Sequence, residues 1–384
     1  MQSVTPQFLR ALQLSHTPID QVEVWRGGQL LKSGNDLQVQ DGKISVSGGD
    51  GQVIRTTVNL TIIDPDGKLV PNKMDDPLAP FGSEVRIKMG IRLGTKNELL
   101  VMGWFPIISL NITEFNDSRT KIGKPDSTIW FSKGAIIELE ASDRMYNLEG
   151  DKFTSRVQPR YTSALGEIRR LLDAKLPPYG GLTGSVPDAT VPSDLTYDTD
   201  RLKAILSLAE ILDADPYIAP NGSFRLLSRI RNGSVWRLEK GEFSVLRNTK
   251  RRITREGVYN GATEISTADN DRPLMARKVV TSGPLRWGGP FGRVPLLHTS
   301  PLLTTQAQVN AAVATVYARA TTLAPQSFGV ECVRNPALQW GDQIELPTRT
   351  GYVLCTITAI TYPLGVENMN LTLTADPFAL RGLI

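Results

Sequence analysis

The stretch Val58-x-Leu60-x-Ile62-x-Asp64-Pro65, continued by Pro80-Phe81-Gly82-Ser83-Glu84-Val85-Arg86-Ile87, belongs to a phrase that occurs twice in this chain. The second copy reads Phe328-x-Val330-x-Cys332, then Asn335-Pro336, then Gln339-Trp340-Gly341-Asp342-Gln343-Ile344-Glu345-Leu346. In both copies, apolar residues at every second position indicate a strand with one buried face, and an Asx-Pro pair begins a turn. An aromatic-Gly pair and a second alternating strand follow. We interpret the phrase as one β-module used twice, which fits a symmetric assembly better than a single active site.

The composition is that of an ordinary soluble chain of about two or three domains. Of the 384 residues, 40% are hydrophobic and 21% are charged, and the 33 Gly and 25 Pro residues indicate many turns. The formal net charge of +4 comes from 43 basic and 39 acidic residues spread along the chain. This balance gives no reason by itself to expect binding to nucleic acid or to a membrane.

The two cysteines, Cys332 and Cys355, form neither a disulfide framework nor a zinc signature. Both lie in apolar strand-like runs, where they are either free buried thiols or a bridge between neighbouring strands. Residues 1–18 lack the pattern of a secretory signal, and no stretch is apolar enough for a spanning helix. We therefore expect no stable insertion into a membrane.

Residues 20–115 read as a first β segment, after an N-terminal helical segment over residues 1–19 that starts at Thr5-Pro6. Pairs such as Gly27-Gly28, Asp41-Gly42 and Asp66-Gly67 predict turns between its strands. The predicted strands are Val22–Trp25, Leu37–Val39, Lys43–Ser47, Thr57–Ile63, Glu84–Met89, Leu99–Met102 and Phe105–Ile112. Seven short strands with glycine turns indicate a small antiparallel barrel or sandwich.

Residues 116–250 read as a mixed α/β insertion, and residues 251–384 as a second β segment with one helix. The insertion contains a predicted strand at Trp130–Ala141, a helix that starts after Ser163, and a second helix that starts near Asp198 and ends before Pro216. The helix of the last segment starts after Thr304 or Thr305. Its predicted strands are Val258–Ile265, Ala276–Thr281, Phe328–Val333, Gln343–Leu346, Val353–Tyr362 and Asn370–Ala375.

Residues that could carry catalysis are sparse. His16 and His298 are the two histidines, and neither lies in a metal-ligand spacing or near a nucleophile motif. Acidic residues cluster at positions 64, 66, 75 and 76 and at 213 and 215, on turns where Asp side chains bond to their own backbone. The glycine-rich stretches lack a following helix and a phosphate-binding lysine. We predict no enzyme activity, no cofactor and no metal.

Five basic residues lie within nine positions: Arg247, Lys250, Arg251, Arg252 and Arg255. One interpretation is contact with a polyanion, either passing nucleic acid or an acidic partner surface. The other is an exposed strand at a sheet edge that charge protects from aggregation. No aromatic residue is interleaved, which argues against stacking on single-stranded nucleic acid.

The stretch from Val22 to Ile112 resembles the first barrel of baseplate hub, or tail-associated, proteins of tailed phages, especially minor tail proteins of actinobacterial siphophages. The resemblance rests on the Arg55–Pro71 stretch, on Asp76-Pro77-Leu78-Ala79-Pro80-Phe81-Gly82-Ser83-Glu84 and on Gly103-Trp104-Phe105. Later segments, Asp215-Pro216-Tyr217, Asn335-Pro336 and Trp340-Gly341-Asp342, are also similar to hub segments. The implied fold is mainly β with an α+β insertion: two small antiparallel β-barrel, tube-forming domains plus a mixed α/β middle domain.

The resemblance implies a structural virion protein, a tail-tip or baseplate hub made in the host cytoplasm. A homotrimer would present six barrels in a ring that ends the tail tube and lets phage DNA pass on ejection. The implied partners are the distal tail protein ring, the tape measure protein and tail fibre or tip proteins. We expect Pro80, Phe81, Gly82, Glu84, Trp340, Gly341 and Asp342 at interfaces. A tail-tip cell-wall glycan hydrolase, a glycan-binding module or a sixfold distal-tail adaptor are the alternatives.

Overall fold

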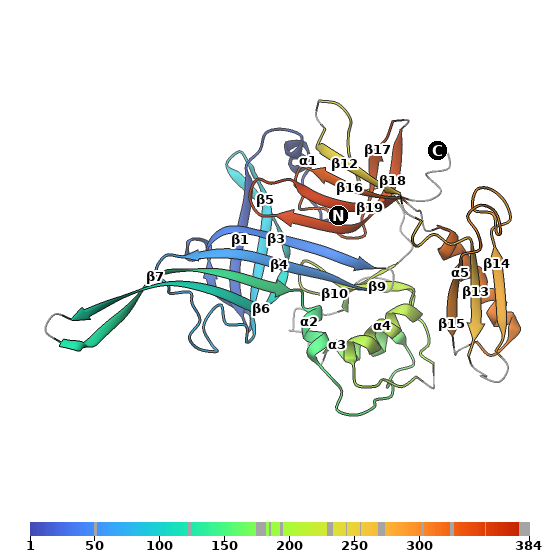
Figure 1. Ribbon diagram of the computed structural model, residues 1–384, viewed down its shortest axis with the longest axis horizontal. Coiled ribbons are helices and arrows are strands. Elements are labelled where there is room, and N and C mark those ends of the chain that lie inside the picture. Colours follow the sequence, from blue (N-terminus) through green and yellow to red (C-terminus); the bar gives the residue numbers. More distant parts are fainter. Residues whose placement is uncertain are drawn as a thin grey trace.

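The computed structural model shows a mainly β protein with few helices (Figure 1). It describes the chain except residues 50–51, 122–123, 174–181, 184–185, 193–194, 229–232, 243, 254, 268–272, 301–302, 323–325, 350 and 376–384. It also leaves aside the side chains of residues 35, 49, 52, 117–121, 124–132, 173, 183, 252–253, 319, 322 and 326.

One 13-stranded sheet contains strands from both β segments of the chain. The N-terminal strands are β1 (Pro18–Arg26), β2 (Gln29–Ser33), β3 (Gln38–Gly49), β4 (Gln52–Asp64), β5 (Ser83–Leu93), β6 (Lys96–Lys121) and β7 (Lys124–Ser142). The C-terminal strands are β11 (Trp236–Arg237), β12 (Leu246–Ile253), β16 (Gln326–Cys332), β17 (Gln343–Pro347), β18 (Tyr352–Pro363) and β19 (Met369–Ala375). We call the two sets the N-terminal unit and the C-terminal unit.

The order of strands is the same in the two units. The N-terminal unit runs β3-β4-β7-β6-β5-β1, with β2 as an additional strand paired to β1. The C-terminal unit runs β12-β16-β19-β18, with β17 paired to β18 and β11 paired to β17. The sequence phrase lies on equivalent strands, β4 and β5 in one unit and β16 and β17 in the other. The predicted duplication is therefore confirmed by the topology, although β11 pairs in parallel where β1 pairs antiparallel.

The residue registers also match between the units. Val58 on β4 pairs with Ala141, and its counterpart Phe328 on β16 pairs with Leu373. β6 has a bulge between Ile107 and Ser109, and β18 has one at the equivalent place, between Ile357 and Ala359. A second shared bulge lies between Val39 and Asp41 in β3 and between Leu246 and Asn248 in β12. Because a bulge shifts the pairing by one residue, two coincident bulges fix the alignment of the units.

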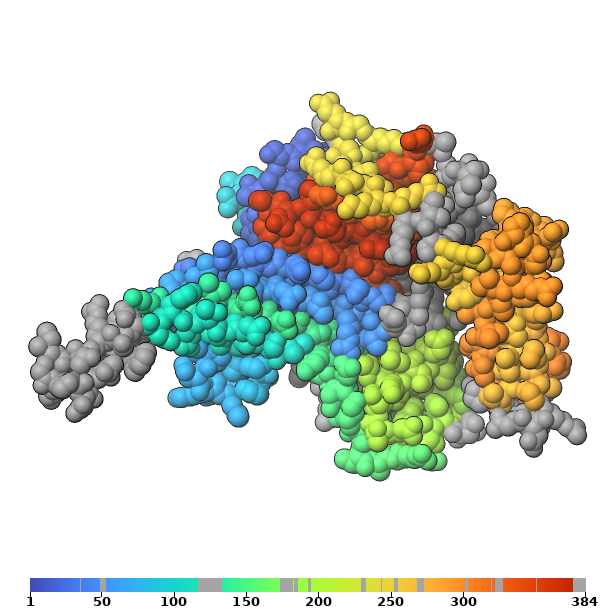
Figure 2. All heavy atoms as spheres, viewed as in Figure 1, coloured from blue at the N-terminus to red at the C-terminus, as the bar shows by residue number. Residues whose placement is uncertain are grey.

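A seam between β18 and β3 joins the two units into one sheet. The antiparallel register at this seam pairs Ile360 with Val46 and Thr361 with Ser45. The apolar faces of both units enclose a single core cluster, which includes Val58 and Ile137 from one unit and Val330 and Leu371 from the other. Figure 2 shows the two units as one continuous surface, blue and red, above the green middle segment.

Two insertions interrupt the repeated pattern. The first follows β7 and contains α2 (Met145–Gly150), α3 (Ala164–Asp173), β8 (Leu182–Thr183), α4 (Arg201–Ile211), β9 (Ala214–Ile218) and β10 (Phe224–Ser228). The second lies between β12 and β16 and contains β13 (Gly261–Ser266), β14 (Met275–Val279), β15 (Pro295–Ser300) and α5 (Gln306–Thr322). Each insertion has a three-stranded sheet of its own. In Figure 1 the second insertion lies at the right-hand side, away from the 13-stranded sheet.

Several sequence-based assignments need correction. The predicted strand Trp130–Ala141 is part of β7 and belongs to the large sheet, not to the middle insertion. The predicted strands Val258–Ile265 and Ala276–Thr281 form their small sheet with β15, apart from the C-terminal strands. β6 and β7 continue beyond their neighbours and project as a two-stranded arm (Figure 1).

The predicted turn at Asp41-Gly42 is a bulge within the continuous strand β3. A Cβ atom on Gly42 would lie 2.6 Å from the Leu60 side chain and 2.9 Å from the Asn59 carbonyl oxygen. The close approach of β3 to β4 at this position therefore requires glycine. The predicted helices are confirmed, with Thr5 as the N-cap of α1 (Pro6–Leu12). Asp200, two residues beyond the predicted start, caps α4.

Neighbouring residues on β4 offer a test of the one-sided burial. We expect Leu60→Ala to lower the free energy of unfolding by about 2–5 kcal/mol, because Leu60 is 2% exposed in the core. Asn59→Ala, on the exposed face of the same strand, should change it by less than about 0.5 kcal/mol. Urea unfolding of both variants measures the difference, and equal losses would contradict the assignment of faces.

Candidate functional site

One face of the 13-stranded sheet is open to solvent and polar. On β4 the side chain of Asn59 is exposed while Leu60 is buried, and on β7 Glu138 and Glu140 are exposed on either side of buried Leu139. Because side chains alternate across a strand, this pattern separates a core face from a polar face. We call the polar side of β6, β7, β4, β3, β18, β19, β16 and β12 the open face.

The open face continues across the seam between the two units. Ser109, Glu140, Asn59 and Lys43 lie in one row of directly paired residues across β6, β7, β4 and β3, and Pro363 of β18 follows Lys43. Residues that are directly paired in a sheet project to the same side. The two copies of the module therefore build a single polar surface and not two separate ones.

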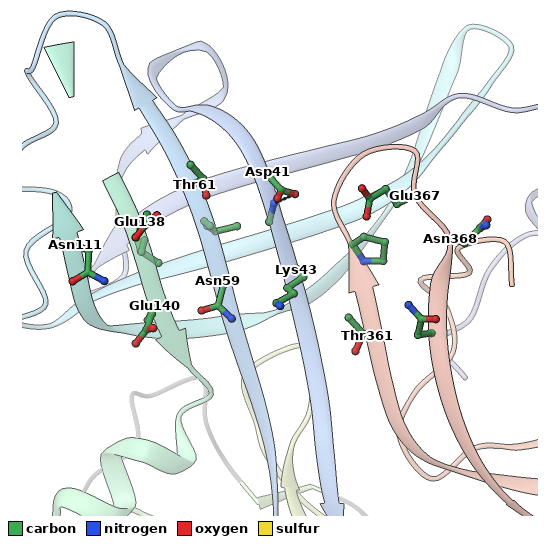
Figure 3. A pocket seen from close by; sticks show the side chains of 15 residues that line it. Asp41, Lys43, Asn59, Thr61, Asn111, Glu138, Glu140, Thr361, Glu367 and Asn368 are labelled. Atoms are coloured by element: carbon green, nitrogen blue, oxygen red, sulfur yellow. Dashed lines mark hydrogen bonds between the residues drawn. The ribbon is translucent and has the colours of Figure 1, made fainter. Parts of the chain in front are cut away.

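A groove of about 620 Å³ lies on the open face where the units meet (Figure 3). Asn59, Thr61, Glu138 and Glu140 project into it from β4 and β7, and Thr361 projects from β18 across the seam. Its ionisable lining residues are Asp41, Lys43, Glu138, Glu140 and Glu367. Four carboxylates against one ammonium group make the groove acidic, which disfavours bound phosphates. No aromatic side chain lines it, so it offers no stacking platform for a sugar or a base.

The turn Pro80–Glu84 divides into an exposed and a buried part. Phe81 is 61% exposed, and Gly82 next to it has a φ of 98°, in the region that favours glycine. Pro80 is half-buried. The carboxylate of Glu84 is buried and accepts two hydrogen bonds from Arg144, at 2.8 and 2.7 Å. Only the tip of this turn is available to another molecule.

The equivalent turn at Trp340–Asp342 is used inside the chain. Trp340 is 7% exposed, packs with Ile54 and Tyr217, and donates its ring N–H to the Thr358 carbonyl at 3.0 Å. Gly341 has a φ of 82°, like Gly82. Asp342 accepts a hydrogen bond from the Met1 ammonium at 2.6 Å. Of the predicted interface residues, Pro80, Phe81 and Gly82 form the exposed part of these two turns.

The basic stretch lies at one end of the large sheet. β12 is the last strand in the order, and Arg247, Lys250 and Arg251 are exposed along it. β12 is therefore an edge strand of the sheet, a position that agrees with both interpretations of the basic stretch. Arg255 lies apart and donates a hydrogen bond to the Phe291 carbonyl at 2.9 Å. The side chain of Arg252 is outside the described part of the chain.

A buried charge network, which the sequence analysis missed, ties the middle insertion to the N-terminal unit. Arg144 is fully buried, pairs with Glu84 and lies 5.1 Å from the ring centroid of Trp104. Arg86 lies 4.8 Å from the centroid of the same ring. Glu23 binds Arg86; burial acts to raise the pKa of Glu23, but hydrogen bonds from three neighbouring side chains lower it. Glu84, which belongs to the repeated phrase, is the one residue of this network that the sequence pattern singled out.

Asp143 clamps the start of α2 to β4. Its carboxylate accepts hydrogen bonds from the backbone N–H of Thr56, at 2.5 Å, and of Met145, at 3.0 Å. Burial raises the pKa of the Asp143 carboxyl from 3.8 to about 6, although both hydrogen bonds favour the charged form. This buried acid lies at the junction between the large sheet and the middle insertion.

The remaining candidate residues have structural partners. Asp64 accepts from the backbone N–H of Lys68 and Leu69, as expected for a turn aspartate, and Asp76 accepts from those of Asn72 and Lys73. His298 contacts the buried carboxylate of Glu264 at 2.8 Å in the second insertion. Within the described ranges, no three His, Cys, Asp or Glu side chains are placed to hold a metal ion.

Both cysteines are free and buried, which decides between the two states left open by the sequence. Burial raises the pKa of the Cys332 thiol. Among the described residues, no helix is both long and apolar enough to cross a membrane.

We expect Arg144→Met to destabilise the fold by about 3–5 kcal/mol, because it leaves the buried Glu84 carboxylate without its partner. Arg55→Met is the matched control, since Arg55 pairs with Glu149 at the surface and exposed pairs contribute less than about 1 kcal/mol. Urea unfolding of the two variants measures the contrast. Similar losses in both would show that the buried pair does not anchor the insertion.

A second prediction concerns pH. The pKa of the Asp143 carboxyl is about 6 in the folded protein, above the ordinary value of 3.8 for an aspartate in an unfolded chain. The native state therefore binds this proton more tightly than the unfolded state does. The wild-type free energy of unfolding should therefore fall by up to about 3 kcal/mol, relative to Asp143→Asn, as the pH rises from about 4 to about 6. Urea midpoints of both proteins between pH 4 and pH 7.5 test this, and parallel curves would contradict it.

No protein-family model matches the sequence, and no curated protein matches it. The tail protein of Neisseria meningitidis MC58 has a similar structure, with a TM-score of 0.60 and 10% identity over 94% of this chain and 98% of that chain. The 43 kDa tail protein of prophage MuSo2 from Shewanella oneidensis gives a TM-score of 0.53, with 10% identity over 94% and 99% of the two chains.

Prophage tail protein gp18 from Listeria monocytogenes EGD-e also gives a TM-score of 0.53, with 9% identity over 93% of this chain and 94% of that chain. These likenesses extend over nearly the full length of each chain. They do not reach the narrower resemblance to actinobacterial siphophages, which stays a prediction. The expected resemblance to tailed-phage proteins is confirmed at the level of the fold: this chain has the fold of phage tail proteins.

Proposed function

We propose that this protein is a structural component of a phage tail tip, a hub that ends the tail tube. The observation that carries the proposal is the open face: two copies of one module place their polar sides on one acidic, continuous surface. The fold of tail proteins supports this assignment. The function is assembly, and the chain works by pairing surfaces and not by transforming a substrate.

The two units are two antiparallel, tube-forming β-barrel domains in this proposal, with the mixed α/β insertion between them. In this proposal the middle domain lies between the end of β7 at Ser142 and the start of β11 at Trp236, in place of the predicted bounds at residues 115 and 250. Three chains present six such modules, so a homotrimer continues a sixfold tube with a threefold ring. The duplicated register supports the ring form, because each unit repeats the same edges.

The open face lines the lumen of this ring. Each chain contributes eight strands to it, and at about 4.8 Å per strand three chains enclose a channel about 37 Å across between backbones. An acidic lining such as the groove with Glu138 and Glu140 does not retain DNA phosphates, so the genome slides through on ejection. The distal tail protein ring, the tape measure protein and fibre or tip proteins are the partners at the two ends, in a virion tail tip.

Mass in solution tests the ring. Three chains of 42.1 kDa should sediment as a particle of about 126 kDa at micromolar concentration. A particle of twice that mass would support the sixfold adaptor instead.

Phe81→Asp should shift the equilibrium towards monomers and leave the free energy of unfolding unchanged, because Phe81 is 61% exposed. Trp340→Asp should instead unfold the chain, since Trp340 is buried within it.

Location in the particle tests the function. Gold-labelled antibody against this chain should mark the end of the phage tail that lies away from the head. Labelling along the whole tail or at the head would contradict the proposal.

Cell-wall zymography on the purified protein tests the hydrolase alternative, for which a cleared band would be required.

A further inference from the structure

The seam between the two units shows how this module pairs with a copy of itself. At the seam, β18 of the C-terminal unit lies antiparallel to β3 of the N-terminal unit. β18 uses two edges: one pairs with β19, and the other pairs first with β17 and then, from Ala359 to Pro363, with β3. The contact is a sheet extension through backbone hydrogen bonds.

Each of the two strands at the seam has a counterpart in the other unit, and the equivalent edges of these counterparts lie at the two ends of the open face. β6 is the counterpart of β18, because both strands have a bulge at the equivalent position. β12 is the counterpart of β3 for the same reason. β6 pairs with β5 up to Pro106 and with β7 from Ile107 onwards. From Ile107 to Glu114, its second edge has no strand partner among the described residues. β12 likewise pairs only with β16 in the described part.

Two unpaired edges of one sheet are an aggregation hazard unless they are covered. Here the edges are complementary in the manner of the seam, since one corresponds to β18 and the other to β3. Such a head-to-tail contact between two different patches generates a closed ring when its rotation closes. The edges also differ in charge: Lys250 and Arg251 lie exposed on β12, whereas Glu114 lies exposed on this part of β6.

Resting on the proposed ring, we infer that β6 of one subunit pairs antiparallel with β12 of the next subunit, in the register of the β18–β3 seam. Pro363 pairs with Lys43 at the seam, and the shared bulges translate this pair into Thr113 opposite Lys250 of the partner subunit. Ile112 then lies opposite Arg251 of the partner subunit. Glu114 becomes the diagonal neighbour of that arginine, within reach of an ion pair.

The two aromatic turns agree with this arrangement. Trp340 precedes β17 in the C-terminal unit and crosses the seam to pack with Ile54 of β4 in the N-terminal unit. Phe81 holds the same position before β5 and is 61% exposed. In the ring, the next subunit covers Phe81 as the N-terminal unit covers Trp340. In this arrangement Lys250 and Arg251 lie at the seam between subunits.

Engineered disulfides test the register. Directly paired strand residues have Cα atoms within disulfide range, so Thr113→Cys combined with Lys250→Cys should link subunits when oxidised with copper phenanthroline. We expect covalent multimers of the 42.1 kDa chain on a non-reducing denaturing gel. The native cysteines give little background because both are buried.

Ser109→Cys with Lys250→Cys is the matched control, because Ser109 lies on the same face but about 13 Å further along β6. It should stay monomeric on the gel. Ser45→Cys with Thr361→Cys is the positive control, since these residues pair within the chain and should close an internal bridge. A 126 kDa particle without the Thr113–Lys250 link, or with equal linkage in the Ser109 control, would overturn this seam and leave the ring intact. A chain that stays monomeric by sedimentation in every variant would overturn both the seam and the ring, while gold labelling judges the tail-tip location separately.

Discussion

The pairing of β18 with β3 is the contact on which the rest of the structure depends. It places two copies of one module side by side in one sheet, so that their apolar faces share a core and their polar faces share a surface. Because side chains alternate with a period of two, a slip of one residue at this seam would turn the polar face of one unit into the core. The matched bulges in β3 and β12, and in β6 and β18, hold both units in the same register.

The two copies have diverged where their surroundings differ. In the C-terminal unit the aromatic turn is buried, because Trp340 meets the N-terminal unit and the middle insertion. In the N-terminal unit the turn keeps Phe81 exposed and uses Glu84 to hold Arg144 at the root of that insertion. One sequence phrase thus serves an internal junction in one place and an outer surface in the other. This asymmetry fits the proposed ring, in which one junction of the repeat lies within the chain and the other lies between chains.

Much of the fold could be predicted from local signals. Alternation identified β4, β5, β16 and β17, and N-cap chemistry placed α1 at Thr5-Pro6. The local signals failed where contacts between strands determine the structure. Asp41-Gly42 is typical of a turn, but in the fold it lies at a bulge of β3, paired with β4 and close to the Leu60 side chain. The partner of Glu84 lies 60 residues away, so no local pattern could pair it with Arg144. The phrase found the two turns, but a single sequence does not show that Trp340 is buried and Phe81 exposed.

The central claim is that two modules per chain, joined through β18 and β3, line one channel with their polar faces. Electron cryomicroscopy of the assembled particle tests this most directly. We predict a ring in which Glu138 and Glu140 face the lumen and the open face continues from one subunit to the next without a break. A particle whose open face points outward, or is covered by another chain, would contradict the claim.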